Sequence, residues 1–174
     1  MRTVVLASVA AAVDYLLLSE LFSHNNTFKD QTFMHKGVGE KLVLGPIWDY
    51  DNAIGNGAIV ELAGWRYGAY PWVERLYAHR GFRRRMARRW MELRAEGLRR
   101  HLMRTIDRGA RQLNGGPQER NFSRWRVFER EDRPNHDTRT GAPAENYAQA
   151  VDYLKWWFKG RMRWITRNVG TLTP

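Results

Sequence analysis

Apolar side chains recur at helical spacing along the C-terminal part of the chain, and this pattern constrains the fold more than any other. They lie at Tyr147, Val151, Leu154, Phe158, Met162, Ile165 and Val169. The spacing follows the period of an α-helix and predicts one long helix over residues 144–168. A helix with one apolar face must bury that face against other elements. The rest of the chain therefore has to supply a partner surface.

Two shorter stripes of the same period lie on either side of Gly97. They consist of Phe82, Met86, Trp90 and Leu93 before it, and of Leu98, Leu102, Ile106, Ala110 and Leu113 after it. They predict helices near residues 80–94 and 97–113, ended by the Asn114–Pro117 turn. A fourth stripe, formed by Val9, Val13, Leu16, Leu17 and Leu21, predicts a buried N-terminal helix. A secretory signal and a membrane span are the alternatives there, and Asp14 argues against the span.

The segment Arg80–Arg111 is strongly basic. It holds twelve Arg against three acidic residues, in a chain whose net charge is +11. Three interpretations fit: a solvated helix face, a surface for an acidic protein or phosphate partner, and a nucleic-acid surface. The aromatic residues of the segment fall on the apolar stripes rather than among the Arg, so specific nucleic-acid binding is not expected.

A β-hairpin is predicted between the first helix and the basic segment, with strands near residues 28–36 and 41–48. The second strand is expected to be the more buried, because its apolar residues are nearly continuous. Residues 52–70 and Glu119–Gly141 are predicted to be loops. The second loop is expected to be anchored on the core by Phe122, Trp125, Val127 and Phe128. The fold class is thus α+β and mainly helical, with one β-hairpin packed on a helical bundle and residues 1–174 as a single domain.

Two carboxylates follow the second predicted strand, in the stretch Trp48-Asp49-Tyr50-Asp51. On an extended strand, Asp49 and Asp51 would point to the same face and could share a cation such as Mg²⁺. The alternative is a turn in which the Asp side chains accept hydrogen bonds from nearby backbone N–H groups. The five His residues show no metal-ligand spacing, and the chain has no Cys, which excludes disulfides and thiolate chemistry.

Four segments together resemble the spore-coat protein H (CotH) kinase-like family, over about residues 13–168. They are "VDYLLLSELF", "TFMHKGVGEKLVLGPIWDYDNAIGNG", "YPWVERLYAHRGFRRRMARRWMEL" and "YLKWWFKGRMRWI". The resemblance implies the C-terminal lobe of an atypical protein kinase-like fold, without the family's N-terminal nucleotide-clamping half. It also implies Mg²⁺ and ATP as cofactors and a protein Ser or Thr as acceptor. Asp49 would hold Mg²⁺ on the nucleotide phosphates. The family's location would be the spore coat, the cell surface or outside the cell.

The sequence departs from the family at the catalytic carboxylate. The family pattern of Asp, four residues, then Asn corresponds here to Asn26 and Gln31, with Asp30 as a substitute carboxylate. Gln31 is the expected cofactor-binding residue, and Asp49 is expected within about 12 Å of Asn26, since both would serve one Mg²⁺–phosphate group. The chain is therefore either an active phosphotransferase or a degenerate relative. The competing class is a non-catalytic basic helical module that binds an acidic protein or nucleic acid.

Overall fold

The computed structural model of the chain describes residues 8–24, 27–56, 61–66, 70–129, 136–137 and 142–172. Within these residues the molecule is mainly helical, with two small antiparallel strand pairs. The helices are α1 (Val9–Phe22), α2 (Pro71–Ala78), α3 (Arg80–Ala95), α4 (Leu98–Leu113), α5 (Pro117–Arg124) and α6 (Tyr147–Asn168). The strands are β1 (Met34–His35), β2 (Val43–Leu44), β3 (His136–Asp137) and β4 (Ala142–Pro143), and short 3₁₀ turns span Val127–Glu129 and Val169–Leu172.

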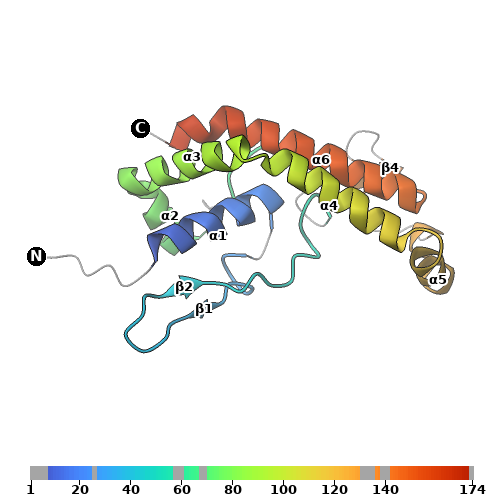
Figure 1. Ribbon diagram of the computed structural model, residues 1–174, viewed down its shortest axis with the longest axis horizontal. Coiled ribbons are helices and arrows are strands. Elements are labelled where there is room, and N and C mark those ends of the chain that lie inside the picture. The colour runs from blue at the N-terminus through green and yellow to red at the C-terminus, as the bar shows by residue number, and fades with distance from the viewer. Residues whose placement is uncertain are drawn as a thin grey trace, which may run out of the picture.

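The helices form two layers, as Figure 1 shows. α3 and α4 run one after the other alongside the long α6, and Gly97, with a left-handed φ of 89°, joins them. α1 lies beneath this layer, and the β1–β2 hairpin lies on the far side of α1. The hairpin is thus separated from α6 by the first helix.

The core lies where α1, α3 and α6 meet. α1 is buried on most of its surface, because it has the helical layer on one side and the hairpin on the other. The buried apolar residues include Val13, Leu16, Leu17 and Leu21 of α1, Phe82, Met86 and Trp90 of α3, and Phe158, Met162 and Ile165 of α6. These positions confirm the predicted stripes of all three helices. The stripe of α4 is only half-buried, and Leu113 at its end is 48% exposed.

The hairpin is real but much smaller than predicted. β1 pairs with β2 over two residues each, with Met34 opposite Leu44 and His35 opposite Val43. The predicted strands 28–36 and 41–48 are therefore wrong in extent. Phe28 is buried in the core while Lys29 and Asp30 are exposed, so residues 27–30 form a turn instead of a strand.

The second strand is the more buried one, as predicted, because Val43 and Leu44 are half-buried whereas Met34 and His35 are exposed. The burial does not extend to the end of the predicted strand. Ile47 is 45% exposed and Trp48 is 58% exposed, and the chain beyond Leu44 is irregular. A continuous apolar run predicts burial only if another element covers both faces. In the part of the chain that the structure describes, no strand continues beyond Leu44 in this segment.

Two short helices were not predicted. α2 and α5 each begin with a proline at the first helical position, where its missing N–H costs nothing. α5 occupies part of the segment that was expected to be an irregular loop. Phe122 packs on Phe128, with ring centroids 4.4 Å apart, but Trp125 is 59% exposed and does not anchor the segment.

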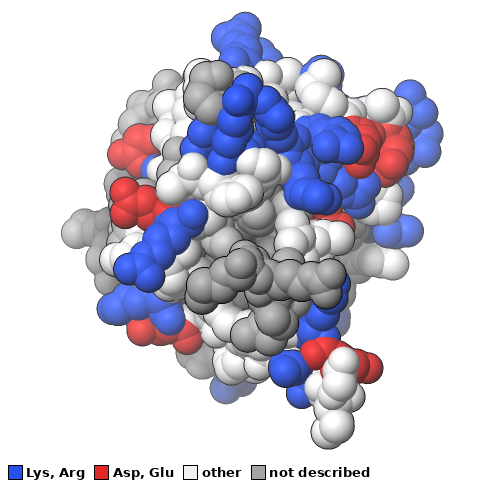
Figure 2. Space-filling view, turned by 90° about the vertical axis from the view of Figure 1, so that its left-hand side faces the viewer, with Lys and Arg blue, Asp and Glu red and all other residues white. Residues whose placement is uncertain are grey.

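Basic side chains dominate one end of the molecule. In Figure 2 the Lys and Arg side chains gather over the upper part of this end, at the height that α3 and α6 occupy in Figure 1. The acidic side chains on this face are fewer and dispersed. Among the residues described, no helix combines the length and the apolar character that a membrane crossing would require.

Candidate functional site

Asp49 lies on the irregular segment that follows β2, and its side chain is exposed. Its backbone is left-handed, with a φ of 57°, a conformation that Asp tolerates better than most residues. Gln31 Nε2, from the turn before β1, donates a hydrogen bond to Asp49 Oδ2. The structure therefore brings two of the predicted site residues into direct contact.

His24 fixes the backbone of Asp49 from the end of α1. Its ring is 2% exposed, and its Nε2 lies 2.7 Å from the carbonyl oxygen of Asp49. A carbonyl can only accept, so Nε2 carries a proton and donates it. On its other side Nδ1 is hydrogen-bonded to Thr27 Oγ1. His24 thus ties the turn after α1 to the segment that carries Asp49.

Tyr50 completes this attachment. Its ring stacks on His24 with centroids 4.3 Å apart, and it meets the edge of Phe22 at 5.5 Å. Its hydroxyl lies 3.0 Å from Ser19 Oγ. The aromatic residue between the two carboxylates therefore points back into the domain, while Asp49 itself faces solvent.

Asp51 is placed in a turn of its own. Its Oδ1 accepts hydrogen bonds from the backbone N–H of Asn52 at 2.7 Å and from Asn52 Nδ2 at 3.2 Å. Asn56 Nδ2 donates to its backbone oxygen at 2.6 Å. The extended geometry on which the shared-cation argument rests is absent, because residues 45–50 form no strand and Asp49 is left-handed. Spacing alone therefore does not bring the two carboxylates onto one face.

The remaining predicted residues are Asn26 and Asp30. Asn26 is outside the described residues, and so is its distance to Asp49. Asp30 is exposed and forms an ion pair with Lys29 at 3.2 Å.

The donor atoms around Asp49 suit Mg²⁺. Gln31 Oε1 is buried and has no hydrogen-bond partner among the residues described, although the amide nitrogen of the same side chain is bonded to Asp49. An amide oxygen beside a carboxylate is a ligand pair of the kind that hard cations prefer. The described residues contain no group of three or more His, Cys, Asp or Glu side chains that could hold a metal.

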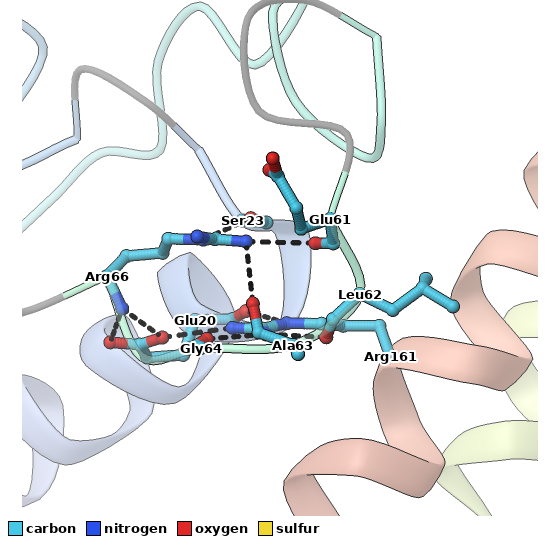
Figure 3. A network of polar contacts seen from close by, with 8 residues as sticks. All are labelled: Glu20, Ser23, Glu61, Leu62, Ala63, Gly64, Arg66 and Arg161. Atoms are coloured by element: carbon cyan, nitrogen blue, oxygen red, sulfur yellow. Dashed lines mark hydrogen bonds and ion pairs between the residues drawn. The ribbon is translucent and has the colours of Figure 1, made fainter. Parts of the chain in front are cut away.

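A second polar cluster lies close to this site and was not predicted. Glu20 of α1 and Arg161 of α6 are both fully buried, and Arg161 Nη2 lies 3.1 Å from Glu20 Oε2 (Figure 3). Arg161 also donates to the backbone oxygens of Glu20, Leu62 and Gly64 at 2.9, 2.9 and 2.7 Å. The buried pair therefore joins α1 and α6 to the loop of residues 61–66.

Arg66 closes the cluster from the loop side. Its backbone N–H lies 3.0 Å from both carboxylate oxygens of Glu20, and its Nε donates to Ser23 Oγ at 2.6 Å. Burial lowers the pKa of Arg161 to about 10, while the Glu20 carboxylate acts in the opposite direction. Arg161 is thus charged at neutral pH, and its charge is compensated inside the protein. One sequence signal pointed to it: Arg161 is three residues after Phe158 and four before Ile165, on the buried face of α6.

A comparison with known protein families shows that the chain is a kinase-like protein. The family model described as CotH kinase protein matches residues 8–165, from the start of α1 nearly to the end of α6. The chain therefore belongs to the CotH kinase family. The match includes Asp49, Gln31 and the Glu20–Arg161 pair. No curated protein and no solved structure matches the chain.

Proposed function

We propose that Asp49 binds Mg²⁺ on the phosphates of ATP, and that the chain takes part in phosphoryl transfer to a Ser or Thr hydroxyl of a protein. The observation that carries this proposal is the contact between Gln31 and Asp49. It leaves the buried Gln31 Oε1, beside an exposed carboxylate, without a partner among the described residues. Membership of the CotH kinase family supports the same chemistry.

Each residue of the site would have a distinct role. Asp49 and Gln31 supply two oxygen ligands, and His24 and Tyr50 hold the backbone that presents Asp49. Mg²⁺, when bound, neutralises the charge that develops on the transferred phosphate. Few ligands and an exposed carboxylate suit a cation that is shared with a nucleotide.

The acceptor hydroxyl needs a base, and here the chain departs from its family. An amide at Asn26 cannot take up a proton as a carboxylate does. Asp30, the nearest carboxylate in the sequence, is exposed and paired with Lys29. We therefore expect phosphoryl transfer by this chain to be slow, while binding of Mg²⁺ and ATP is retained.

Thermal unfolding with millimolar ATP, with and without Mg²⁺, tests the binding step. A ligand present at about 100 times its dissociation constant stabilises the folded state by about 2.7 kcal/mol. We expect Asp49→Asn to remove the Mg²⁺-dependent part of this gain. Without ligand, the variant should unfold within about 0.5 kcal/mol of the original chain, because the Asp49 side chain is exposed.

Glu40→Gln is the matched control, since Glu40 is an exposed carboxylate in the turn of the same hairpin. It should leave the Mg²⁺-dependent stabilisation unchanged. The proposal fails if the original chain shows no such stabilisation, or if Asp49→Asn retains it. A separate measurement tests the role of position 26 as the base. The variant Asn26→Asp should raise phosphate transfer to a Ser/Thr protein substrate. If the transfer does not increase, position 26 has no part in the mechanism.

A further inference from the structure

A basic pocket lies between α6 and the junction of α3 and α4. Its volume is about 480 Å³, within the range of small-molecule sites. We define the basic pocket by its five cationic lining residues, Arg94, Arg99, Lys159, Arg163 and Arg167. Trp156, Met162 and Thr166 line the remainder. The cations therefore surround one hollow and do not simply cover a helix face.

The pocket follows from the sequence of two elements. On α6 the spacing of Trp156, Lys159, Arg163 and Arg167 is three, four and four, so these residues share one helix face. On the other side, the left-handed Gly97 ends α3 and starts α4, and it is flanked by Arg94 and Arg99. The first turn of α4 holds no acidic residue that would compensate the positive end of its dipole.

Within the described residues, no carboxylate is paired with any of the five cations of the pocket. The only described side-chain contact of Arg94 is a hydrogen bond that it donates to the sulfur of Met91 at 3.6 Å.

Two carboxylates of the same region, Glu96 after α3 and Asp107 of α4, have other partners. Glu96 lies 3.9 Å from Arg89, and Asp107 forms an ion pair with Lys155. That ion pair, more than Lys159, holds the pKa of Asp107 below its usual range. Like charges held together in this way repel one another, and a bound anion would relieve the repulsion.

We propose that the basic pocket binds a small anion that carries several phosphate groups. Four of its five cations are Arg, whose planar guanidinium matches phosphate oxygens in pairs, and Trp156 provides an apolar wall. One orthophosphate would compensate only about two of the five charges, whereas a chain or ring of phosphates compensates all of them. Linear polyphosphates and inositol polyphosphates share this chemistry.

This site is separate from the one at Asp49. The basic pocket is built from α3, α4 and α6. Asp49 lies in the segment after the β1–β2 hairpin, where it contacts His24 and Gln31, and that hairpin lies on the far side of α1 from α6 (Figure 1). The inference does not depend on the proposed kinase chemistry. Binding at the basic pocket should require no Mg²⁺, because the protein supplies the positive charges itself.

Isothermal titration calorimetry with tripolyphosphate, in EDTA and at about 150 mM salt, tests the proposal. The variant Arg99→Gln/Arg163→Gln should weaken binding by about tenfold or more, since tenfold corresponds to 1.4 kcal/mol and two charge-assisted contacts are lost. The matched control Arg104→Gln/Arg108→Gln removes the same charge from exposed positions of α4 outside the pocket. It should change the affinity by less than about threefold. Circular dichroism should show that both double variants are folded. If Arg99→Gln/Arg163→Gln is not folded, the single variant Lys159→Gln takes its place.

Orthophosphate and inositol hexakisphosphate are the comparison ligands. Inositol hexakisphosphate binding more tightly than tripolyphosphate would assign an inositol polyphosphate, and the reverse order would assign a linear polyphosphate. Equal affinity for orthophosphate would overturn the proposal, as would the absence of binding at this salt concentration or an equal loss in the control variant. Duplex DNA or polyglutamate that binds as tightly through the same two arginines would assign a macromolecular surface instead. Asp49→Asn should leave tripolyphosphate binding intact, which separates this result from that of the Mg²⁺–ATP experiment.

Discussion

Glu20 and Asp49 are two carboxylates near the same end of α1 with opposite environments. Glu20 is fully buried, and it is bonded to the side chain of Arg161 and the backbone of Arg66. Asp49 is exposed, and its described partner is the amide of Gln31. A buried carboxylate needs all of its acceptor capacity to offset the loss of water, whereas an exposed one keeps capacity for a cation. The comparison separates the carboxylate that holds the fold from the one available for chemistry.

The largest expected effect comes from breaking the buried pair. Arg161→Leu leaves Glu20 charged and buried without its guanidinium partner, and we expect the free energy of unfolding to fall by about 3–5 kcal/mol. Urea unfolding measures the loss. Arg104→Leu, at an exposed position of α4, should change it by no more than about 0.5 kcal/mol.

The double variant Glu20→Gln/Arg161→Leu tests whether the unpaired charge of Glu20 causes this loss of stability. The neutral amide no longer carries a buried charge but still accepts the N–H of Arg66. It should therefore be more stable than Arg161→Leu alone. If the second substitution instead lowers the stability further, the unpaired charge is not the cause of the loss.

A smaller loss of stability is expected when His24 is replaced. This residue connects the end of α1, close to Glu20, with the segment that carries Asp49. His24→Ala leaves Thr27 and the carbonyl of Asp49 without their partner, and we expect it to cost about 1–3 kcal/mol. In the folded protein it should also weaken Mg²⁺-dependent ATP binding, because the backbone of Asp49 loses its support. The exposed His101→Ala is the control for both measurements. His24→Asn retains a donor and an acceptor and should recover part of the affinity; unchanged affinity in His24→Ala would contradict a positioning role.

The smallest effect on stability is expected at a half-buried ion pair, that of Asp107 and Lys155. The hydrogen bond from Lys155 lowers the pKa of Asp107. A carboxyl whose pKa is lower in the folded state stabilises that state above its unfolded pKa of about 4 and loses the contribution as the pH falls. Asp107→Asn should therefore lower the urea midpoint slightly near pH 6 and not at all near pH 2.5. An equal difference at both pH values would contradict the electrostatic explanation.

The helices α1, α3, α4 and α6 could be predicted because each carries an apolar stripe over at least three turns. The same method missed α2 and α5, whose eight residues cover only about two turns and give too few repeats to count. It also missed Arg161, because counting a single apolar stripe passes over a charged residue on the same face. Burial of that charge depends on Glu20, which no local pattern could supply.

The candidate site was predicted from a strand geometry that the structure does not contain. The sequence of residues 41–48 is apolar enough for a buried strand, yet only Val43 and Leu44 pair regularly with β1. The contact of Asp49 with Gln31 depends on the turn after α1 and on His24, which was set aside in the sequence because it lacked metal-ligand spacing. His24 acts through the backbone of Asp49, and spacing rules for ligands do not detect such a role.

The pair of Glu20 and Arg161 joins residues that are 141 positions apart in the chain. During synthesis α1 and the hairpin leave the ribosome long before α6 does, so Glu20 has no guanidinium partner until the last helix emerges. The first helix therefore cannot reach its final burial early without leaving a charge uncompensated in the interior. The nascent N-terminal region should stay protease-sensitive until residue 161 is available, and acquisition of resistance should be a late, all-or-none event that includes the Asp49 segment.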